Sequence, residues 1–220
     1  AKLGRKVLLV DADAGLRSLD LMMGIGGSAV YDMADIFAGN CEPIRAIYPS
    51  PVCPGVSVLP APVSLERLCT PEDMRRLCRG FARYYDDVLI DSAAGGGAGF
   101  ETAVASAQRA LVVTTPDMVC ARDAQIVSRL LEDRQIPARL LINRLRARPV
   151  MAGRMPDVDE IIDTAGLQLM GILPEDEAVA VANANGRPLP SDCYAAACFG
   201  NIARRFLGEQ VPLANLEKMI

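Results

Sequence analysis

The stretch KVLLVDADAGLRSLD (residues 6–20) decides the fold, because an apolar run of strand length ends there in two carboxylates. The run is continuously apolar from Val7 to Val10, which is typical of a strand that is covered on both faces in a parallel sheet. In open α/β sheets, ligands bind in the crevice beyond the carboxyl ends of the strands. We therefore interpret Asp11 and Asp13 as candidates for contact with a ligand.

Further apolar runs of strand length recur along the chain, and stretches with helical spacing of apolar residues lie between them. The runs are VSVLPA (56–61), DVLID (87–91), ALVVTT (110–115), ARLLIN (138–143) and LQLMGILP (167–174). The helical stretches are LERLCTPEDMRRLCRGFARYY (65–85), FETAVASAQ (100–108), MVCARDAQIVSRLLEDRQ (118–135) and DVDEIIDTAG (157–166). This alternation predicts an α/β fold with a doubly wound, mostly parallel sheet and helices on both faces.

Local signals agree with this organisation. Thr70 is the expected N-cap of a helix whose first turn holds Pro71, with Asp73 three residues after the cap. Pro137 and Pro174 lie at expected ends of elements. No repeat or linker divides the chain, so we expect a single domain over residues 1–220.

The composition excludes several classes of function. The 220 residues contain no histidine, which excludes Ser–His and Cys–His catalysis and any zinc site with a histidine ligand. The formal net charge of -4 argues against a nucleic-acid groove. The seven cysteines form no C-x-x-C pair, and we expect reduced thiols that serve as small apolar groups. No apolar run approaches the ~20 residues needed to span a bilayer, so we expect a soluble protein.

A second strand ends in a carboxylate within VLIDSAAGGG (88–97). This is the Walker-B pattern, in which a carboxylate at the end of a strand holds Mg²⁺, although Asp91 could equally be a turn or cap residue. The glycines do not make a dinucleotide fingerprint, because Phe100 occupies the last position of GGGAGF (95–100). GIGGSA (24–29) has the spacing but lies well after the first strand, so we interpret it as a loop.

Two further strand ends carry polar side chains. In LLINRLR (140–146), Asn143 can donate and accept together, as reading an adenine edge requires, and Arg144 could lie against a ring or a phosphate. The alternative for Asn143 is an ordinary turn at the end of a strand. In GILPEDEAV (171–179), the segment Pro174, Glu175, Asp176 taken alone predicts the start of a helix.

Taken together, these blocks make the chain resemble the ParA/MinD family of P-loop ATPases, and within it the MinD branch. DADAGLRSLD (11–20) with TTPDMVCARDA (114–124) is the most specific combination. The other matching blocks are VYDMADIFAGN (30–40), YDDVLIDSAAG (85–95), LLINRLR and GILPEDEAVAVANANGRPL (171–189). They occur in family order over nearly the whole chain.

The resemblance implies an ATPase that uses ATP and Mg²⁺. It implies that two carboxylates of the first switch act on the attacking water and the Mg²⁺ shell, that one Walker-B carboxylate holds the metal, and that two loops hold adenine. Asp11 and Asp13 would be the carboxylates of the first switch, and Asp91 would be the Walker-B carboxylate. Asn143 and Arg144 would form one adenine loop, and Pro174 and Asp176 the other.

The resemblance also implies a role in division-site selection. The helix around Arg122 and Asp123 would face a division inhibitor of the MinC type, although these residues could equally be a solvated helix surface. The intact protein would dimerise with ATP, respond to a topological regulator, and be cytoplasmic and peripheral at the inner face of the cell membrane. No nucleic-acid partner is expected.

The chain departs from the family pattern in its phosphate loop. No G-x-x-x-x-G-K-[ST] motif occurs in the 220 residues, and lysine is found only at Lys2, Lys6 and Lys218. We expect a chain truncated at its N-terminus that does not hydrolyse ATP, because the loop and its lysine neutralise the phosphates. The family's first strand is central, so its two neighbours would carry unpaired backbone rows. We also expect this chain to lack the family's C-terminal membrane helix, since residues 201–220 end where the linker to that helix begins in the family.

Smaller departures and alternatives stay open. DSAAG (91–95) has Ala93 where the family usually has proline, which loosens that turn. A flagellar-number or chromosome-partition ATPase of the same group is the alternative within the fold. A P-loop-less paralogue acting as a non-catalytic scaffold is an alternative from another class, and a flavodoxin-like or nicotinamide-binding domain is a third.

Overall fold

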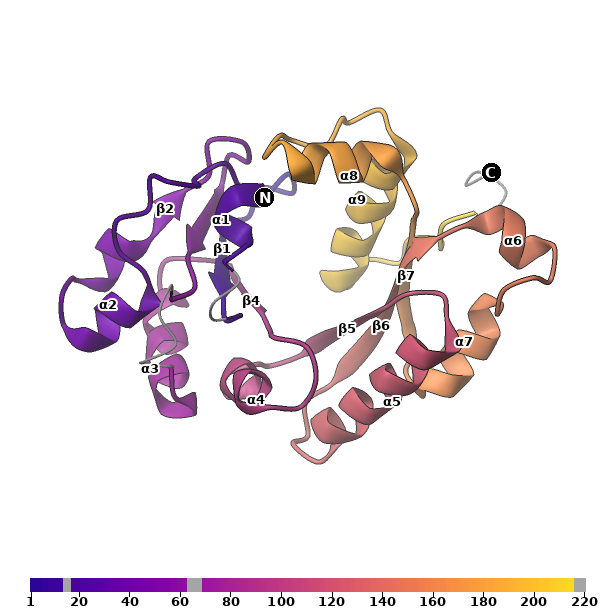
Figure 1. Ribbon diagram of the computed structural model, residues 1–220, viewed down its shortest axis with the longest axis horizontal. Helices are drawn as coiled ribbons and strands as arrows, with labels where there is room; N and C mark the ends of the chain where they lie inside the picture. The colour runs from indigo at the N-terminus through magenta and orange to yellow at the C-terminus, as the bar shows by residue number, and fades with distance from the viewer. Residues whose placement is uncertain (14–16, 63–68, 216–220) are drawn as a thin grey trace. The chain divides into compact units, whose positions relative to one another are not determined.

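The chain packs as two compact units in a computed structural model that describes residues 1–13, 17–62 and 69–215 (Figure 1). The first unit comprises Ala1–Ala107 with Ala182–Pro188, and the second comprises Gln108–Val181 with Leu189–Ile220. Each unit has its own sheet, and each is described by itself. The single domain over residues 1–220 stays a prediction.

The sheet of the first unit has the strand order β2-β3-β1-β4. Strand β1 (Val7–Asp11) lies between β3 (Val56–Leu59) and β4 (Asp87–Asp91) and pairs with both in parallel. The short β2 (Tyr48–Pro49) adds an antiparallel pair to β3. The predicted strands are therefore confirmed in this unit, whereas β2 has only two residues and too little pattern to be predicted.

The core of the first unit packs two helices against the buried face of the sheet. Helices α2 (Met33–Ala38) and α3 (Pro71–Phe81) contribute Met33 and Met74, which are buried with Leu8, Val10 and Leu59 of the strands. The remaining helices of the unit are α1 (Leu19–Met22), the 3-10 helix η1 (Pro43–Ala46) and α4 (Ala98–Val104).

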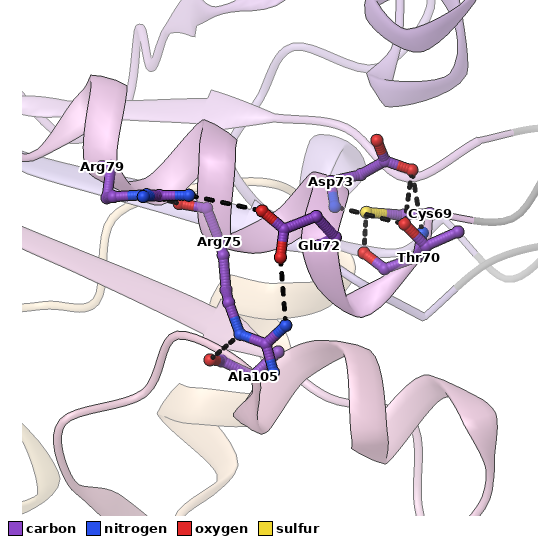
Figure 2. Close-up of polar contacts among 7 residues, drawn as sticks. All are labelled: Cys69, Thr70, Glu72, Asp73, Arg75, Arg79 and Ala105. Carbon is purple, nitrogen blue, oxygen red and sulfur yellow. Dashed lines mark hydrogen bonds and ion pairs between the residues drawn. The ribbon is translucent and has the colours of Figure 1, made fainter.

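Helix α3 begins where its capping signal predicts. The Thr70 hydroxyl accepts a hydrogen bond from the Asp73 N–H at 3.2 Å, and the Asp73 carboxylate accepts one from the Thr70 N–H at 3.3 Å. Figure 2 shows this box beside an exposed network in which Glu72 bonds Arg75 and Arg79. The first part of the predicted helix, residues 65–68, lies outside the described residues.

The sheet of the second unit is fully parallel, in the order β5-β6-β7. Its strands are β5 (Ala110–Thr114), β6 (Ala138–Leu145) and β7 (Leu169–Pro174). Helices α5 (Met118–Glu132) and α7 (Val158–Ala165) pack together, while α9 (Tyr194–Phe206) packs against β7 on the other face (Figure 1). Helices α6 (Ala147–Met151) and α8 (Glu177–Ala184) follow β6 and β7.

The parallel α/β class with helices on both faces is confirmed, but the described strands form two sheets rather than one. Within the described residues, β4 and β5 are each the last strand of their sheet. Their side chains are unusually exposed for apolar residues of parallel strands: Leu89 is 44% exposed, Leu111 37% and Val113 56%. The cause is that no described strand pairs with the free edge of either.

A clamp on the C-terminal segment completes the second unit. The half-buried Arg205 guanidinium of α9 donates to the carbonyl oxygens of Met170, Val211 and Pro212. The Tyr194 hydroxyl both accepts from the Asn215 N–H and donates to the Asn215 carbonyl oxygen. These contacts hold residues 211–215 against α9 and β7.

Among the described helices, none is both long and apolar enough to cross a bilayer.

Candidate functional site

The first group of candidate residues lies at the carboxyl ends of two neighbouring strands in the first unit. Asp11 ends β1 and Asp91 ends β4, and the two are register partners. The Ala12 N–H donates to the Asp91 carbonyl oxygen at 2.9 Å, which extends the pairing one step beyond the strand. Asp13 is close enough to both carboxylates to raise their pKa values through its charge. We call Asp11, Asp13 and Asp91 the acidic cluster.

The Asp11 carboxylate is buried and accepts its hydrogen bonds from main-chain N–H groups. The residue is 1% exposed, and the donors are the Asp13 N–H at 3.1 Å and the Leu19 N–H at 3.4 Å. These bonds join the end of β1 to Asp13 and to Leu19, the first residue of α1. Asp13 is half-buried and Asp91 is exposed, so these two carboxylates are the ones that a ligand can reach. The catalytic roles of Asp11 and Asp13 stay predictions.

The electrostatics of the acidic cluster favour a cation. Burial raises the pKa of Asp11, the N–H donors of Asp13 and Leu19 partly oppose that rise, and the charges of Asp91 and Asp13 add to it. Although the Asp91 residue as a whole is exposed, partial desolvation of its carboxyl group and the Asp13 charge also raise its pKa. A bound divalent ion would relieve this repulsion.

The donor set fits Mg²⁺ in its chemistry. Carboxylate oxygens are hard ligands, and Mg²⁺ is usually held by one or two protein carboxylates while it keeps several waters. Among the described residues, no three His, Cys, Asp or Glu side chains come together as a metal site. Asp13 and Asp91 are the carboxylates of the cluster that could supply such ligands, since Asp13 is half-buried and Asp91 is exposed. The role of Asp91 as metal ligand stays a prediction.

Arg17 and Asp20 form an ion pair in the same unit that the sequence analysis did not predict. Asp20 of α1 is 5% exposed and accepts a hydrogen bond from the Arg17 Nε at 2.8 Å. Its Oδ1 is buried and has no hydrogen-bond partner among the described residues. Arg17 has φ +43°, in the left-handed region that non-glycine residues rarely adopt. The signal that could have found the pair is the i, i+3 spacing of Arg17 and Asp20 at a helix start.

The second group of candidates lies at the carboxyl ends of β6 and β7 in the second unit. Asn143 and Arg144 interrupt the end of β6, and Pro174 is the last residue of β7, opposite Leu145. The Arg144 guanidinium bonds the Glu175 carboxylate through two contacts, Nε–Oε2 at 2.8 Å and Nη2–Oε1 at 3.3 Å. These contacts bring the two predicted adenine loops together within this unit.

Asp176 lies at the start of the next helix, as the sequence predicts, whereas Pro174 ends the predicted strand run 167–174 and does not lie in the first helical turn. The Asp176 carboxylate accepts from the Ala178 N–H at 2.9 Å at the start of α8. Pro174 belongs to β7 instead, because it closes the strand pairing opposite β6. The adenine-binding roles of Asn143, Arg144, Pro174 and Asp176 stay predictions.

Helix α5 presents Arg122 and Asp123 on its exposed face. Two apolar side chains are exposed on the same helix, Val119 at 71% and Ile126 at 58%. Val119, Arg122 and Ile126 follow the i, i+3, i+7 spacing of one helix face. We call Val119, Arg122, Asp123 and Ile126 the α5 face. Its mixture of apolar and charged groups is typical of a protein interface, and the partner-binding roles of Arg122 and Asp123 stay predictions.

The start of α5 is rigidly built, which fixes the orientation of this face. The Asp117 carboxylate accepts from the N–H groups of Val119 at 3.1 Å and Cys120 at 2.9 Å, and from the Thr115 hydroxyl at 2.6 Å. The hydrogen bonds from Cys120 and Thr115 lower the pKa of Asp117.

The acidic cluster lies in one unit and the adenine loops in the other, so the single pocket that joins them stays a prediction.

Comparison with solved structures defines the class of the fold. The chain superposes on a chain of the MinC:MinD cell division protein complex of Aquifex aeolicus with a TM-score of 0.90 and 33% identity, covering 98% of this chain and 88% of that one. It also matches the septum site-determining protein MinD of Pyrococcus horikoshii, complexed with Mg-ADP, with a TM-score of 0.82 and 25% identity over 93% of this chain and 84% of that one. The class is therefore the P-loop ATPases of ParA/MinD type.

Curated sequences narrow this class. The septum site-determining protein MinD of a Synechocystis strain is 38% identical over 217 residues, which are 96% of this chain and 82% of that protein. The chain belongs to the MinD family. No protein-family model matches it.

Proposed function

We propose that the chain is the body of a MinD-type ATPase that acts in division-site selection. The single observation that carries this proposal is the combination of 38% identity to a septum site-determining protein MinD with the 0.90 TM-score to a chain of a MinC:MinD complex. In the intact protein, a single domain binds ATP, dimerises with it, responds to a topological regulator and brings a MinC-type inhibitor to the membrane surface. The protein is cytoplasmic and peripheral at the inner face of the cell membrane.

The acidic cluster supports the assignment of the metal and the reacting phosphate. Asp91 would hold Mg²⁺, which neutralises phosphate charge when bound. Asp13 lies beside Asp91 and would orient a water at the same edge of the sheet. Asp11 would keep the loop after β1 in place through its bonds to the Asp13 and Leu19 N–H groups.

The adenine loops support the assignment of the nucleotide base. Asn143, Arg144, Pro174 and Asp176 all lie at the carboxyl ends of β6 and β7, where parallel sheets bind ligands. The 220 residues hold no Walker-A lysine, and their acidic cluster repels phosphate. We therefore expect this chain by itself to bind nucleotide weakly and not to hydrolyse ATP.

The α5 face supports the assignment of the partner. Its exposed Val119 and Ile126 supply apolar area, and Arg122 with Asp123 supplies charge of both signs. Arginine is enriched among the residues that contribute most to binding at protein interfaces, and Arg122 lies between the two exposed aliphatic side chains on this face.

The test is binding of purified Aquifex aeolicus MinC to the immobilised chain. We expect saturable binding that Arg122→Glu weakens by about tenfold or more, the range of an interface hot spot. Arg76→Glu is the matched control, since Arg76 is an exposed arginine on a different helix, α3. Equal loss in both variants would point to general electrostatics, and unchanged binding of Arg122→Glu would remove the α5 face from the proposal.

A further inference from the structure

The end of β6 contains a bulge at Asn143 and Arg144. Ile142 pairs with Ile172, and the next register pair is Leu145 with Pro174. Two residues of β6 therefore oppose one residue of β7. A bulge of this kind bends the strand and re-aims its side chains, and bulges are over-represented beside functional sites.

The bulge carries backbone strain. Arg144 has φ +58°, which places a non-glycine residue in the left-handed region. This conformation is unfavourable for a residue with a Cβ, so surrounding contacts must hold it. Three contacts do so: the Asn143 Oδ1 accepts from the Arg144 N–H at 2.9 Å, the Glu175 N–H donates to the Leu145 carbonyl oxygen at 2.9 Å, and the Arg144 guanidinium bonds Glu175 twice.

These contacts determine how the Asn143 amide is presented. Its Oδ1 is engaged by the Arg144 N–H and retains one lone pair, and no described residue accepts a hydrogen bond from its Nδ2. Asn143 is half-buried at the carboxyl end of β6. An amide with a free N–H pair and a free lone pair complements the adenine edge that offers N7 and the N6 amino group, whereas guanine offers two acceptors there.

We propose that the Arg144–Glu175 ion pair is a latch that positions the Asn143 amide and thereby sets a preference for adenine over guanine. Arg144 and Glu175 are positioning residues in this arrangement, because they act through Asn143. The inference rests on the proposed function, which assigns the base to these two loops. It goes further by giving Glu175 a role and by making the base preference depend on an ion pair.

The latch is stronger than its exposure suggests. The side chains of Arg144 and Glu175 are 66% and 40% exposed, and an exposed ion pair of ordinary geometry contributes little. Here the planar fork of Arg144 meets both carboxylate oxygens of one glutamate. The Glu175 main chain is also hydrogen-bonded to Leu145, which fixes the backbone from which the carboxylate reaches Arg144.

The test compares adenosine with guanosine as probes, because nucleosides lack phosphates and report on the base site alone. Binding to the full chain is followed by saturation-transfer NMR, with main-chain hydrogen exchange of Arg144 as a second readout. The variants are Glu175→Gln, which removes the charge at constant shape, and Arg144→Lys, which removes the fork. Glu177→Gln is the matched control, since this exposed carboxylate lies two residues away on α8.

We expect the wild-type chain to prefer adenosine by about tenfold, the discrimination that one bidentate base contact supplies. Glu175→Gln and Arg144→Lys should reduce this ratio to near one and accelerate exchange of the Arg144 N–H, while Glu177→Gln leaves both unchanged. The exchanged pair, Arg144→Glu with Glu175→Arg, should recover part of the preference. A purely structural role would lower the affinity for both nucleosides equally.

Two results would overturn the latch, and they differ in what they imply. If the wild type prefers adenosine and Glu175→Gln keeps that preference, the latch is wrong while the assigned base site stands. If the wild type binds neither nucleoside, the assignment of the base to these loops fails and the latch fails with it. Binding of MinC to the α5 face is independent of either result.

Discussion

Asp11 and Asp91 are register partners at the carboxyl ends of two adjacent parallel strands, and the Ala12 N–H joins them by donating to the Asp91 carbonyl oxygen at 2.9 Å. One of these carboxylates is buried and bonded to main-chain N–H groups, and the other is exposed. The same strand pairing therefore produces one carboxylate that holds a loop and one that is open to a ligand.

The acidic cluster should make stability depend on pH in a defined direction. The pKa values of Asp11 and Asp91 are raised in the folded chain, so the folded state binds their protons more tightly than the unfolded state does. This stabilisation is fully present below the unfolded pKa of about 4 and is lost as pH rises through the folded values. Asp91→Asn should reduce the loss of stability with rising pH. At neutral pH it should raise the free energy of unfolding by about 0.5 kcal/mol.

The measurement is thermal unfolding of both proteins at a series of pH values from about 4 upward. The difference between the two curves isolates the cluster from other titrating groups. Asp159→Asn, an exposed carboxylate of α7 in the other unit, is the control. Parallel curves for wild type and Asp91→Asn would contradict the predicted repulsion.

A divalent cation should reverse the repulsion. We expect millimolar Mg²⁺ to bind the folded cluster more tightly than the dispersed carboxylates of the unfolded chain and therefore to raise the unfolding temperature at neutral pH. Asp91→Asn should abolish most of this rise, because it removes the most exposed ligand of the cluster. The comparison uses NaCl of equal ionic strength to remove general screening. An equal rise in both proteins would exclude Asp91 from the metal site.

The Cys69 thiol should be nearly inert to alkylation. All seven cysteines are free thiols, but burial, with smaller contributions from Asp73 and Cys78, raises the pKa of Cys69 to about 12. Only the thiolate reacts, so at pH 8 Cys69 should react about 1,000-fold more slowly than an ordinary cysteine. Mass spectrometry of peptides after timed iodoacetamide treatment measures this, with the half-exposed Cys193 for comparison. Equal rates would show that the α3 start opens readily.

The Arg205 clamp should contribute substantially to the stability of the second unit. Arg205→Ala leaves the carbonyl oxygens of Met170, Val211 and Pro212 without their donor, which should cost about 2 kcal/mol. Arg204→Ala is the neighbouring control, since Arg204 makes an exposed ion pair with Glu209 and should cost about 0.5 kcal/mol. Urea unfolding measures both. Equal losses would mean that solvent replaces the clamp.

Much of the fold could be predicted from the sequence, because parallel strands buried on both faces appear as continuous apolar runs. All six predicted strand runs overlap observed strands, and Thr70 caps α3 as predicted. These features depend on neighbours along the chain, which a sequence displays directly. The short β2 depends on pairing across the fold and could not be predicted. The run 167–174 ends at Pro174 as β7 does, whereas the helix that GILPEDEAV suggests begins only at Glu177.

The candidate site was only partly accessible to sequence reasoning. Strand ends point to Asp91 and Asn143, since position in a parallel sheet follows from the order of runs. Three features of the site could not be predicted. They are the hydrogen bonds from main-chain N–H groups to Asp11, the burial of Asp20, and the ion pair between Arg144 and Glu175. Each depends on side chains that approach after folding, and Glu175 is 31 residues from Arg144 in the sequence.

The free edges of β4 and β5 govern how the protein behaves when it is concentrated. Each edge offers a row of main-chain donors and acceptors beside exposed apolar side chains such as Leu89 and Val113. Such a row pairs with any extended polypeptide of suitable sequence, and another copy of the same chain is the most abundant one in a pure sample. Within the described part of the chain these edges have no strand partner, so we expect intermolecular strand pairing to promote self-association as the concentration rises.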